Sequence, residues 1–255
     1  MDFQGKVAVV TGASRGIGAA IAKAFAEEGA AVAINYKSNK IAADNIVREC
    51  QNIGGIASSF KADVTKPCKG QSLIDEVQSE FGKIDILVNN AFRAYQFDPD
   101  KRAMFWDLDW DHYQAQIEGS VLATHSLCRA VLPLMRKNTT GSIINITSDL
   151  ISRPSIPYHD YTTAKSALTG FSKNLATELG PLGIRVNCVA PGLVYPTDAS
   201  ANTKETVKDL IISQTPLRRI ANPKDVTGPV LFLASDWSRF ITGQTIYVDG
   251  GFVMN

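Results

Sequence analysis

Residues 6–18 of this chain read KVAVVTGASRGIG. The apolar, β-branched run Lys6–Thr11 is typical of a buried strand, and the composition of Ala19–Glu28 behind it favours a helix. A strand, a glycine-rich turn and a helix in this order form the opening unit of proteins that alternate strands with helices. This stretch therefore predicts an α/β fold.

The same alternation runs through the rest of the sequence. Six more apolar runs predict strands at Ala31–Asn35, Ile56–Ala62, Ile84–Asn89, Ser142–Thr147, Ile184–Val189 and Thr245–Val248. Helical patterns between them lie at Ile41–Asn52, Gln71–Phe81, Trp110–Lys137 and Tyr161–Leu179. Repeated β-α units with continuous apolar strands predict a parallel sheet with helices on both faces. No linker or repeat interrupts the pattern, so we expect a single domain over residues 1–255.

Composition argues against several classes of partner. The 255 residues are 45% hydrophobic and 20% charged, and the formal net charge of +1 gives no electrostatic basis for binding nucleic acid or an anionic membrane. No apolar run approaches the roughly 18 residues of a membrane span, and the N-terminus has no apolar signal core. The four cysteines are scattered without disulfide or metal-ligand spacing, so we expect a cytoplasmic protein without a metal site.

The glycine-rich turn predicts a nucleotide site. Its glycines permit a tight bend and let a diphosphate approach the backbone N–H groups at a helix N-terminus. The cofactor contacts that we expect from the turn are Gly12, Ser14, Arg15, Gly16, Ile17 and Gly18. The alternative is a turn that only packs a helix against a strand, but its position after an N-terminal apolar strand favours nucleotide binding.

The end of the second strand indicates which nucleotide binds. An acidic residue there would hydrogen-bond the adenosine ribose 2′-hydroxyl of NAD. This chain has Asn35, Tyr36 and Lys37 at that point, which we expect to contact the cofactor, and the next acidic residue is Asp44. Lys37 and Arg15 offer the cations that a 2′-phosphate requires. NADP(H) is therefore favoured over NAD(H), with solvated surface charge as the alternative role for both cations.

A second motif supplies acid–base chemistry. Tyr161 precedes Lys165 by one helical turn, so both side chains can point into one cleft. A phenol has an ordinary pKa of about 10, and a nearby cation lowers that pKa towards the working range. Ser148 follows the fifth strand, where its hydroxyl can hold a carbonyl oxygen against the phenol. A Tyr-x-x-x-Lys pair also arises by chance, and Ser152 and Ser155 are alternative serines that do not directly follow a strand.

These motifs meet at one edge of the predicted sheet. Ligands of parallel sheets bind beyond the carboxyl ends of the strands. Thr11-Gly12, Asn89-Asn90 and Ser148 end the first, fourth and fifth strands, and Pro191-Gly192 follows the sixth. Their convergence on one edge is harder to explain by chance than any single motif.

In combination the motifs resemble those of the short-chain dehydrogenase/reductase family over nearly the whole chain. They are Thr11-Gly-x-x-x-Gly16-x-Gly18, Asp63-Val64, Asn89-Asn90-Ala91, Ser148, Tyr161-x-x-x-Lys165, Asn187, Pro191-Gly192 and Val248-Asp249-Gly250-Gly251. Within the family the chain is most similar to the 3-oxoacyl-acyl-carrier-protein reductase group. The resemblance implies a Rossmann-like, doubly wound sheet of about seven strands and hydride transfer at C4 of the nicotinamide.

The resemblance also implies roles for single residues. Ser148 would polarise the substrate carbonyl, Tyr161 would deliver the proton, and Lys165 would hold the nicotinamide ribose. The remaining cofactor contacts that it implies are Asp63, Val64, Asn89, Ala91, Pro191, Gly192, Val194 and Thr197. It further implies a homotetramer acting on a small carbonyl or alcohol substrate, free or carried on acyl carrier protein or CoA.

Two positions depart from the family pattern. Phe92 stands where the family usually has the glycine of Asn-Asn-Ala-Gly. Counting back without gaps from Val121 places Ile117 where the family usually has an asparagine that supports a water relay to the lysine. Isoleucine can neither donate nor accept a hydrogen bond. The alternative is a shift of one residue, which would put Gln116 at that position.

Apolar residues in the loops beyond the strands suggest a largely apolar substrate with a carbonyl or secondary hydroxyl group. The pocket residues that we expect are Phe92, Ile117, Leu150, Tyr158 and Leu193. A non-catalytic NADP(H)-binding sensor or partner protein is the alternative function. The intact Ser148, Tyr161 and Lys165 argue against it, because a protein that only binds has no chemical use for all three.

Overall fold

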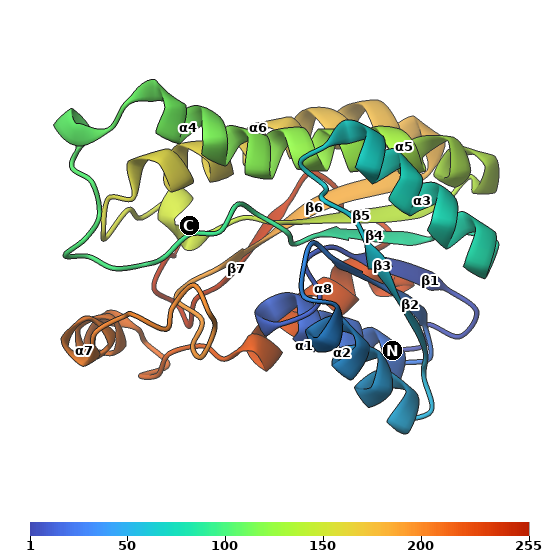
Figure 1. Cartoon of the computed structure of the whole chain (residues 1–255), viewed down its shortest axis with the longest axis horizontal. Coiled ribbons are helices and arrows are strands. Elements are labelled where there is room, and N and C mark those ends of the chain that lie inside the picture. The colour runs from blue at the N-terminus through green and yellow to red at the C-terminus, as the bar shows by residue number, and fades with distance from the viewer. Residues whose placement is uncertain (255) are drawn as a thin grey trace.

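Seven strands form one parallel sheet in the computed structural model, which describes residues 1–254 (Figure 1). Their order across the sheet is β3-β2-β1-β4-β5-β6-β7. The strands are β1 (Val7–Val10), β2 (Ala31–Tyr36), β3 (Ile56–Lys61), β4 (Ile86–Asn89), β5 (Gly141–Ile146), β6 (Ile184–Pro191) and β7 (Thr245–Val248). The predicted parallel sheet is confirmed. The expected domain ends at residue 255, which lies outside the described residues.

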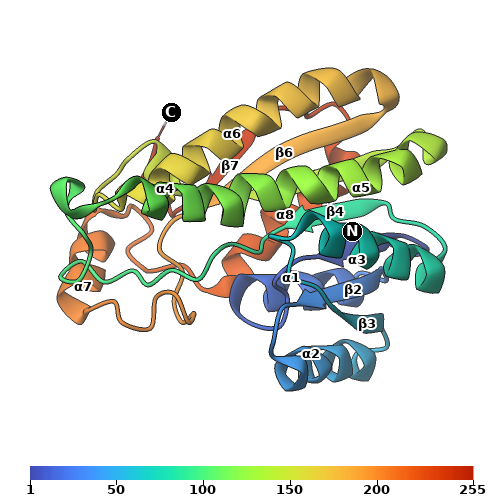
Figure 2. The same cartoon turned by 45° about the horizontal axis from the view of Figure 1, so that its top comes forward.

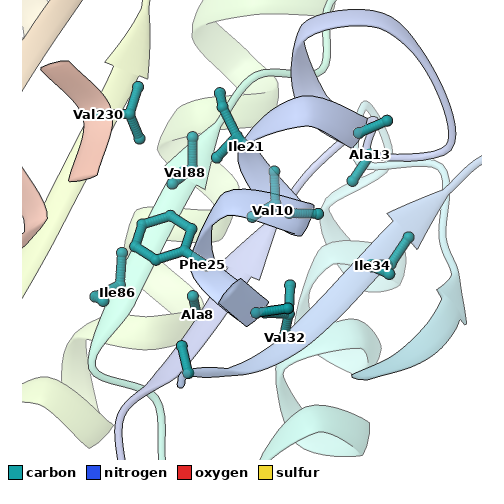
Figure 3. Packing of buried hydrophobic residues seen from close by; sticks show 14 of the residues in the cluster. Ala8, Val10, Ala13, Ile21, Phe25, Val32, Ile34, Ile86, Val88 and Val230 are labelled. Atoms are coloured by element: carbon teal, nitrogen blue, oxygen red, sulfur yellow. The ribbon is translucent and has the colours of Figure 1, made fainter. Parts of the chain in front are cut away.

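Alternate side chains of the central strands pack on opposite faces of the sheet. Ala8 and Val10 of β1 meet Ile21 and Phe25 of α1 in one buried cluster, which also includes Val230 of α8 (Figure 3). This face is covered by α1 (Gly16–Glu27), α2 (Lys40–Asn52) and α8 (Thr227–Ala234). Every position of β1 is buried, as a parallel strand between two helical layers requires.

The other face carries the longer helices. Val9 of β1 and Leu87 of β4 pack there with Leu73, Leu127 and Met135. The helices of this layer are α3 (Pro67–Phe81), α4 (Trp110–Ile117), α5 (Ala123–Asn138) and α6 (His159–Leu179) (Figure 2). The remaining helix, α7 (Glu205–Gln214), lies at the same end of the molecule as α4 in both views, beyond the sheet (Figure 1, Figure 2).

The helix expected over Trp110–Lys137 differs from the structure. A π-helical turn, Glu118–Leu122, separates α4 from α5. A π-helical turn adds one residue to a helix, so a gap-free count of residues across it changes face. Apolar composition is similar on both sides of the turn, which is why periodicity predicted one continuous helix.

None of the helices in residues 1–254 has the length and apolar character that crossing a bilayer would need.

Candidate active site

The glycine-rich turn is fastened to the end of β4. The Thr11 hydroxyl oxygen accepts hydrogen bonds from the backbone N–H groups of Asn90 and Ala91, each at 3.0 Å. The Asn90 amide donates back to the Thr11 carbonyl at 2.8 Å. The first and fourth strands are adjacent and parallel, so their carboxyl ends meet here. The structure therefore brings two of the predicted motifs together.

Two glycines of the turn are required by its geometry. Gly12 has φ +62°, in the left-handed region that favours glycine. A Cβ on Gly18 would lie 2.6 Å from both the Asn90 amide nitrogen and the Gly12 carbonyl oxygen, so no side chain fits. The first turn of α1 follows directly, and the side chain of its N-cap residue, Arg15, makes no capping hydrogen bond. Backbone N–H groups in this setting fit a diphosphate.

Asn35 has a different role from the one expected. Its side-chain amide donates to the carbonyls of Phe60 at 3.3 Å and Ala62 at 3.2 Å, and its oxygen accepts from the Gly12 N–H at 3.3 Å. The residue is 2% exposed. Its polar atoms tie the glycine turn to β2 and β3, so Asn35 holds the site together and is not available to a ribose. Tyr36 is buried as well.

The two expected cations are exposed, and each lies beside a carboxylate. Lys37 Nζ is 2.9 Å from Asp63 Oδ2. Arg15 is 2.5 Å from Asp198, on the segment that follows β6. A methyl carbon of Thr197 in the same segment would lie 3.7 Å from a Cβ on Gly16. The loop after β6 therefore lies against the glycine turn, with Thr197 and Asp198 beside Gly16 and Arg15.

Asn89 begins a buried polar chain that crosses from β4 to α6. Its amide donates to Asn145 Oδ1 at 2.8 Å, and the Asn145 amide donates to the Ser172 hydroxyl at 2.7 Å. Asn89 Oδ1 is buried and has no hydrogen-bond partner within residues 1–254. Sequence reasoning did not single out Asn145, although an asparagine inside the apolar strand β5 was a visible signal, because a buried amide needs partners.

The predicted catalytic residues come together at the carboxyl end of β5. Ser148 follows the strand in an extended conformation, and Tyr161 and Lys165 occupy the first two turns of α6. All three are buried, at 6%, 7% and 3% exposure respectively. Lys165 Nζ donates to the Ile146 carbonyl at 2.7 Å and lies 5.7 Å from the centre of the Tyr161 ring.

The direction of the Tyr161 pKa differs from expectation. Burial raises the pKa of the phenol well above its ordinary value, while the Ser148 hydroxyl acts in the opposite direction. Burial also lowers the pKa of Lys165 to about 8. The spacing of Tyr161 and Lys165 in the sequence indicates only the attraction between cation and phenolate. In the structure Lys165 points to a strand carbonyl, and loss of hydration dominates for both groups.

Aromatic rings surround Tyr161. The ring centres of Phe92, Tyr95 and Phe97 lie 6.1, 5.2 and 5.1 Å from that of Tyr161. Tyr158 joins the group through Tyr95 and Phe97, at 5.7 and 5.3 Å. Two expected pocket residues, Phe92 and Tyr158, thus belong to one aromatic cluster with Tyr95 and Phe97. It makes the surroundings of the phenol largely apolar.

The other expected pocket residues lie in different surroundings. Leu193 lines a cavity of about 230 Å³ together with Gly192 and Asp149. Leu150 and Ile117 are half-buried. The buried polar residues near Ile117 are Gln116 and Ser120, and Ser120 Oγ has no hydrogen-bond partner in the part of the chain that the structure describes. Ser120 lies inside the π-helical turn, whose extra residue a count along the sequence does not reveal.

Comparison with known proteins identifies the family. A family model described as Enoyl-(Acyl carrier protein) reductase matches residues 12–253. A solved 7α-hydroxysteroid dehydrogenase, complexed with NADH and 7-oxo glycochenodeoxycholic acid, is 33% identical with a TM-score of 0.90, covering 100% of this chain and 96% of that one. The chain belongs to the short-chain dehydrogenase/reductase family.

Two curated relatives match this short-chain dehydrogenase/reductase over nearly its whole length. An uncharacterized oxidoreductase of Methylorubrum extorquens is 40% identical, covering 98% of each chain. A 3-oxoacyl-[acyl-carrier-protein] reductase of Staphylococcus epidermidis is 38% identical, covering 98% of this chain and 99% of its own. The protein is therefore an oxidoreductase of this family. No group of three or more His, Cys, Asp or Glu side chains able to hold a metal ion occurs within its described residues.

Proposed function

We propose that the protein is an NADP(H)-dependent oxidoreductase that interconverts a carbonyl and a secondary alcohol, best matched to a 3-oxoacyl thioester or a related ketone. The observation that carries the proposal is the burial of Ser148, Tyr161 and Lys165 together, at the sheet edge where the glycine turn ends. A proton donor, a cation and a hydroxyl meet in surroundings that water does not screen.

Several residues around the glycine turn fit a dinucleotide. Gly12 and Gly18 leave room for the backbone to approach a diphosphate, and Arg15 and Lys37 supply charge for a 2′-phosphate. No acidic residue occupies the end of β2, where NAD enzymes hold the ribose hydroxyl. Further residues that would hold the cofactor are Ser14, Gly16, Ile17, Asp63, Val64, Ala91, Pro191, Gly192, Val194 and Thr197. When bound, the cofactor supplies or accepts the hydride.

Three side chains of the protein bind the substrate oxygen and transfer a proton to or from it. The Ser148 hydroxyl donates a hydrogen bond to the carbonyl oxygen, which polarises the carbonyl and fixes its position. In reduction, Tyr161 delivers a proton to that oxygen, and in oxidation it removes the proton. Lys165 is charged below a pKa of about 8, so at neutral pH it stabilises the phenolate that Tyr161 leaves behind.

The aromatic cluster supports an apolar substrate. Phe92, Tyr95 and Phe97 present rings around Tyr161, which favours an acyl or alicyclic ketone over a charged one. The Staphylococcus epidermidis relative is named for a 3-oxoacyl substrate, and the solved relative is complexed with 7-oxo glycochenodeoxycholic acid, so a ketone is common to both ligands. We propose that the substrate is either free or carried on acyl carrier protein or CoA. We also propose that the protein assembles as a homotetramer.

The deciding experiment measures turnover on a panel of ketones and 3-oxoacyl thioesters with NADPH. We expect the wild type to reduce at least one of them, and Tyr161→Phe to bind NADPH by fluorescence titration while losing turnover by a factor of about 10² or more. A wild type that binds NADPH but turns over none of the panel would favour the sensor function instead.

A further inference from the structure

A carboxylic acid lies directly behind the catalytic serine. Asp149 follows Ser148 and opens a short 3₁₀ turn, and it is buried, at 6% exposure. The Ser148 hydroxyl donates to Asp149 Oδ1 at 3.3 Å and accepts from the Leu150 N–H at 3.3 Å. The single proton of Ser148, which the proposed reaction directs at the substrate, therefore has a competing acceptor within the protein.

A second carboxylate faces Asp149 across Gly192. A Cβ on Gly192 would lie 3.2 Å from Asp149 Oδ2 and 3.0 Å from Asp249 Cβ. Asp249 accepts the backbone N–H groups of Gly251 at 3.0 Å and Val253 at 2.8 Å, so its oxygens are committed as acceptors.

The cations near this pair are engaged elsewhere. The Arg153 guanidinium donates to the Phe252 carbonyl at 2.7 Å and to Gln214 Oε1 at 2.9 Å. Arg219, across the cavity that Asp149 lines, is paired with Asp225 at 2.6 Å. Tyr161 is a titratable neighbour on α6, and the charge of Asp149 raises the pKa of that phenol.

The surroundings of Asp149 favour its neutral form. Burial, and then the charge of Asp249, raise its pKa from the ordinary 3.8 to about 7, against the opposing hydrogen bonds from Ser148 and the backbone. Because the pKa is raised, the group is protonated below about pH 7 and ionised above it. Its charge therefore changes in the range in which the enzyme would work.

We propose that Asp149 is a positioning residue that decides whether the Ser148 hydroxyl proton points at the substrate or back into the protein. As a carboxylate, Asp149 accepts the Ser148 proton and places negative charge near the developing oxyanion. As a neutral carboxylic acid, Asp149 is a weaker hydrogen-bond acceptor, and the Ser148 hydroxyl donates to the substrate carbonyl oxygen instead. This role rests on the proposed carbonyl reduction and adds a pH-dependent control to it.

The test compares pH profiles of kcat/KM for ketone reduction. Above the pKa of a required acid, kcat/KM falls about tenfold per pH unit. We expect the wild-type profile to begin falling near pH 7. Asp149→Asn cannot ionise, so its decline should begin only near pH 8, where Lys165 loses its charge. Asp160→Asn is the matched control, because Asp160 is a buried acid that hydrogen-bonds Tyr95 and not Ser148, and it should keep the wild-type decline.

Each outcome decides between the two proposals. A wild type that turns over, with an Asp149→Asn profile identical to it, overturns the role of Asp149 and leaves the proposed function standing. A wild type without turnover overturns both. Carboxyl ¹³C NMR of aspartate-labelled wild type gives a reading that needs no variant: one carboxyl should titrate near pH 7, and a set that titrates entirely below pH 5 would overturn the inference.

Discussion

The ring of Phe92 lies 5.3 Å from Lys165 Nζ and 6.1 Å from the centre of the Tyr161 ring. An aromatic side chain, at a position where the family usually has glycine, thus faces both the cation and the phenol of the site. A cation at this distance from a ring face is stabilised by about 0.5–1 kcal/mol where the ring is partly exposed. The ring also adds apolar surface next to the Tyr161 ring.

Replacement of Phe92 should separate these two effects. Phe92→Gly removes both the apolar surface and the ring face, and we expect KM for apolar ketones to rise about fivefold or more, with a smaller change in kcat. Phe92→Leu keeps the apolar surface without the ring, so it should restore most of KM. Steady-state kinetics on two ketones of different chain length measure both values. Equal KM in all three proteins would show that the ring does not contact substrate.

Lys37 provides the test of cofactor preference. Removal of its ammonium group in Lys37→Ala should raise KM for NADPH about tenfold and leave KM for NADH nearly unchanged, because only NADPH carries the 2′-phosphate. Lys40→Ala is the matched control, since Lys40 is an exposed lysine of α2 that pairs with Asp44. A parallel rise for both cofactors in Lys37→Ala would contradict the NADP(H) assignment.

The π-helical turn leads to a paired prediction at Ile117 and Ser120. Ser120 Oγ is buried in the turn that packs against α6, whereas the Ile117 side chain is half-buried and cannot pass a proton. We expect Ile117→Asn to leave turnover and its pH profile unchanged, and Ser120→Ala to lower turnover about tenfold or more. Thermal unfolding serves as the control, because loss of one hydroxyl should barely move Tm. Wild-type turnover in Ser120→Ala would exclude Ser120 from proton transfer.

The strands were predictable because most of them are apolar runs bounded by turn residues. Their number and parallel pairing follow from such runs alternating with helical patterns. The π-helical turn was not predictable, because inserting one residue into an amphipathic helix leaves no mark in composition. A count of residues across the turn therefore cannot tell whether Ile117 or Gln116 occupies a given face of the helix.

For the site residues, position was predictable from sequence, but side-chain direction and pKa were not. The position of Asn35 at the end of β2 was predicted from sequence, but the direction of its amide, towards the carbonyls of Phe60 and Ala62, depends on how β2 pairs with β3. The motif Tyr161-x-x-x-Lys165 placed both groups on one helix. Their pKa values depend on burial by strands and loops far away in sequence, so the pattern alone gave the wrong direction for Tyr161.

The buried ammonium group of Lys165 should lower the free energy of unfolding, because burial removes its charge from water. Its pKa of about 8 lies below the ordinary 10.5, so protonated Lys165 opposes folding below pH 8, and the opposition disappears as pH rises towards 10.5. The difference corresponds to roughly 3 kcal/mol at pH 7. Lys165→Met removes the charge and keeps the apolar stem, but it leaves the Ile146 carbonyl without its donor. We therefore expect a net gain of about 1–2 kcal/mol in unfolding free energy, together with loss of turnover.

Urea unfolding from pH 7 to pH 10 measures this: the wild type should gain stability across that range while Lys165→Met stays level. A Lys165→Met protein less stable than the wild type at pH 7 would mean that the ammonium stabilises the fold, and that the site holds its cation without a cost in stability.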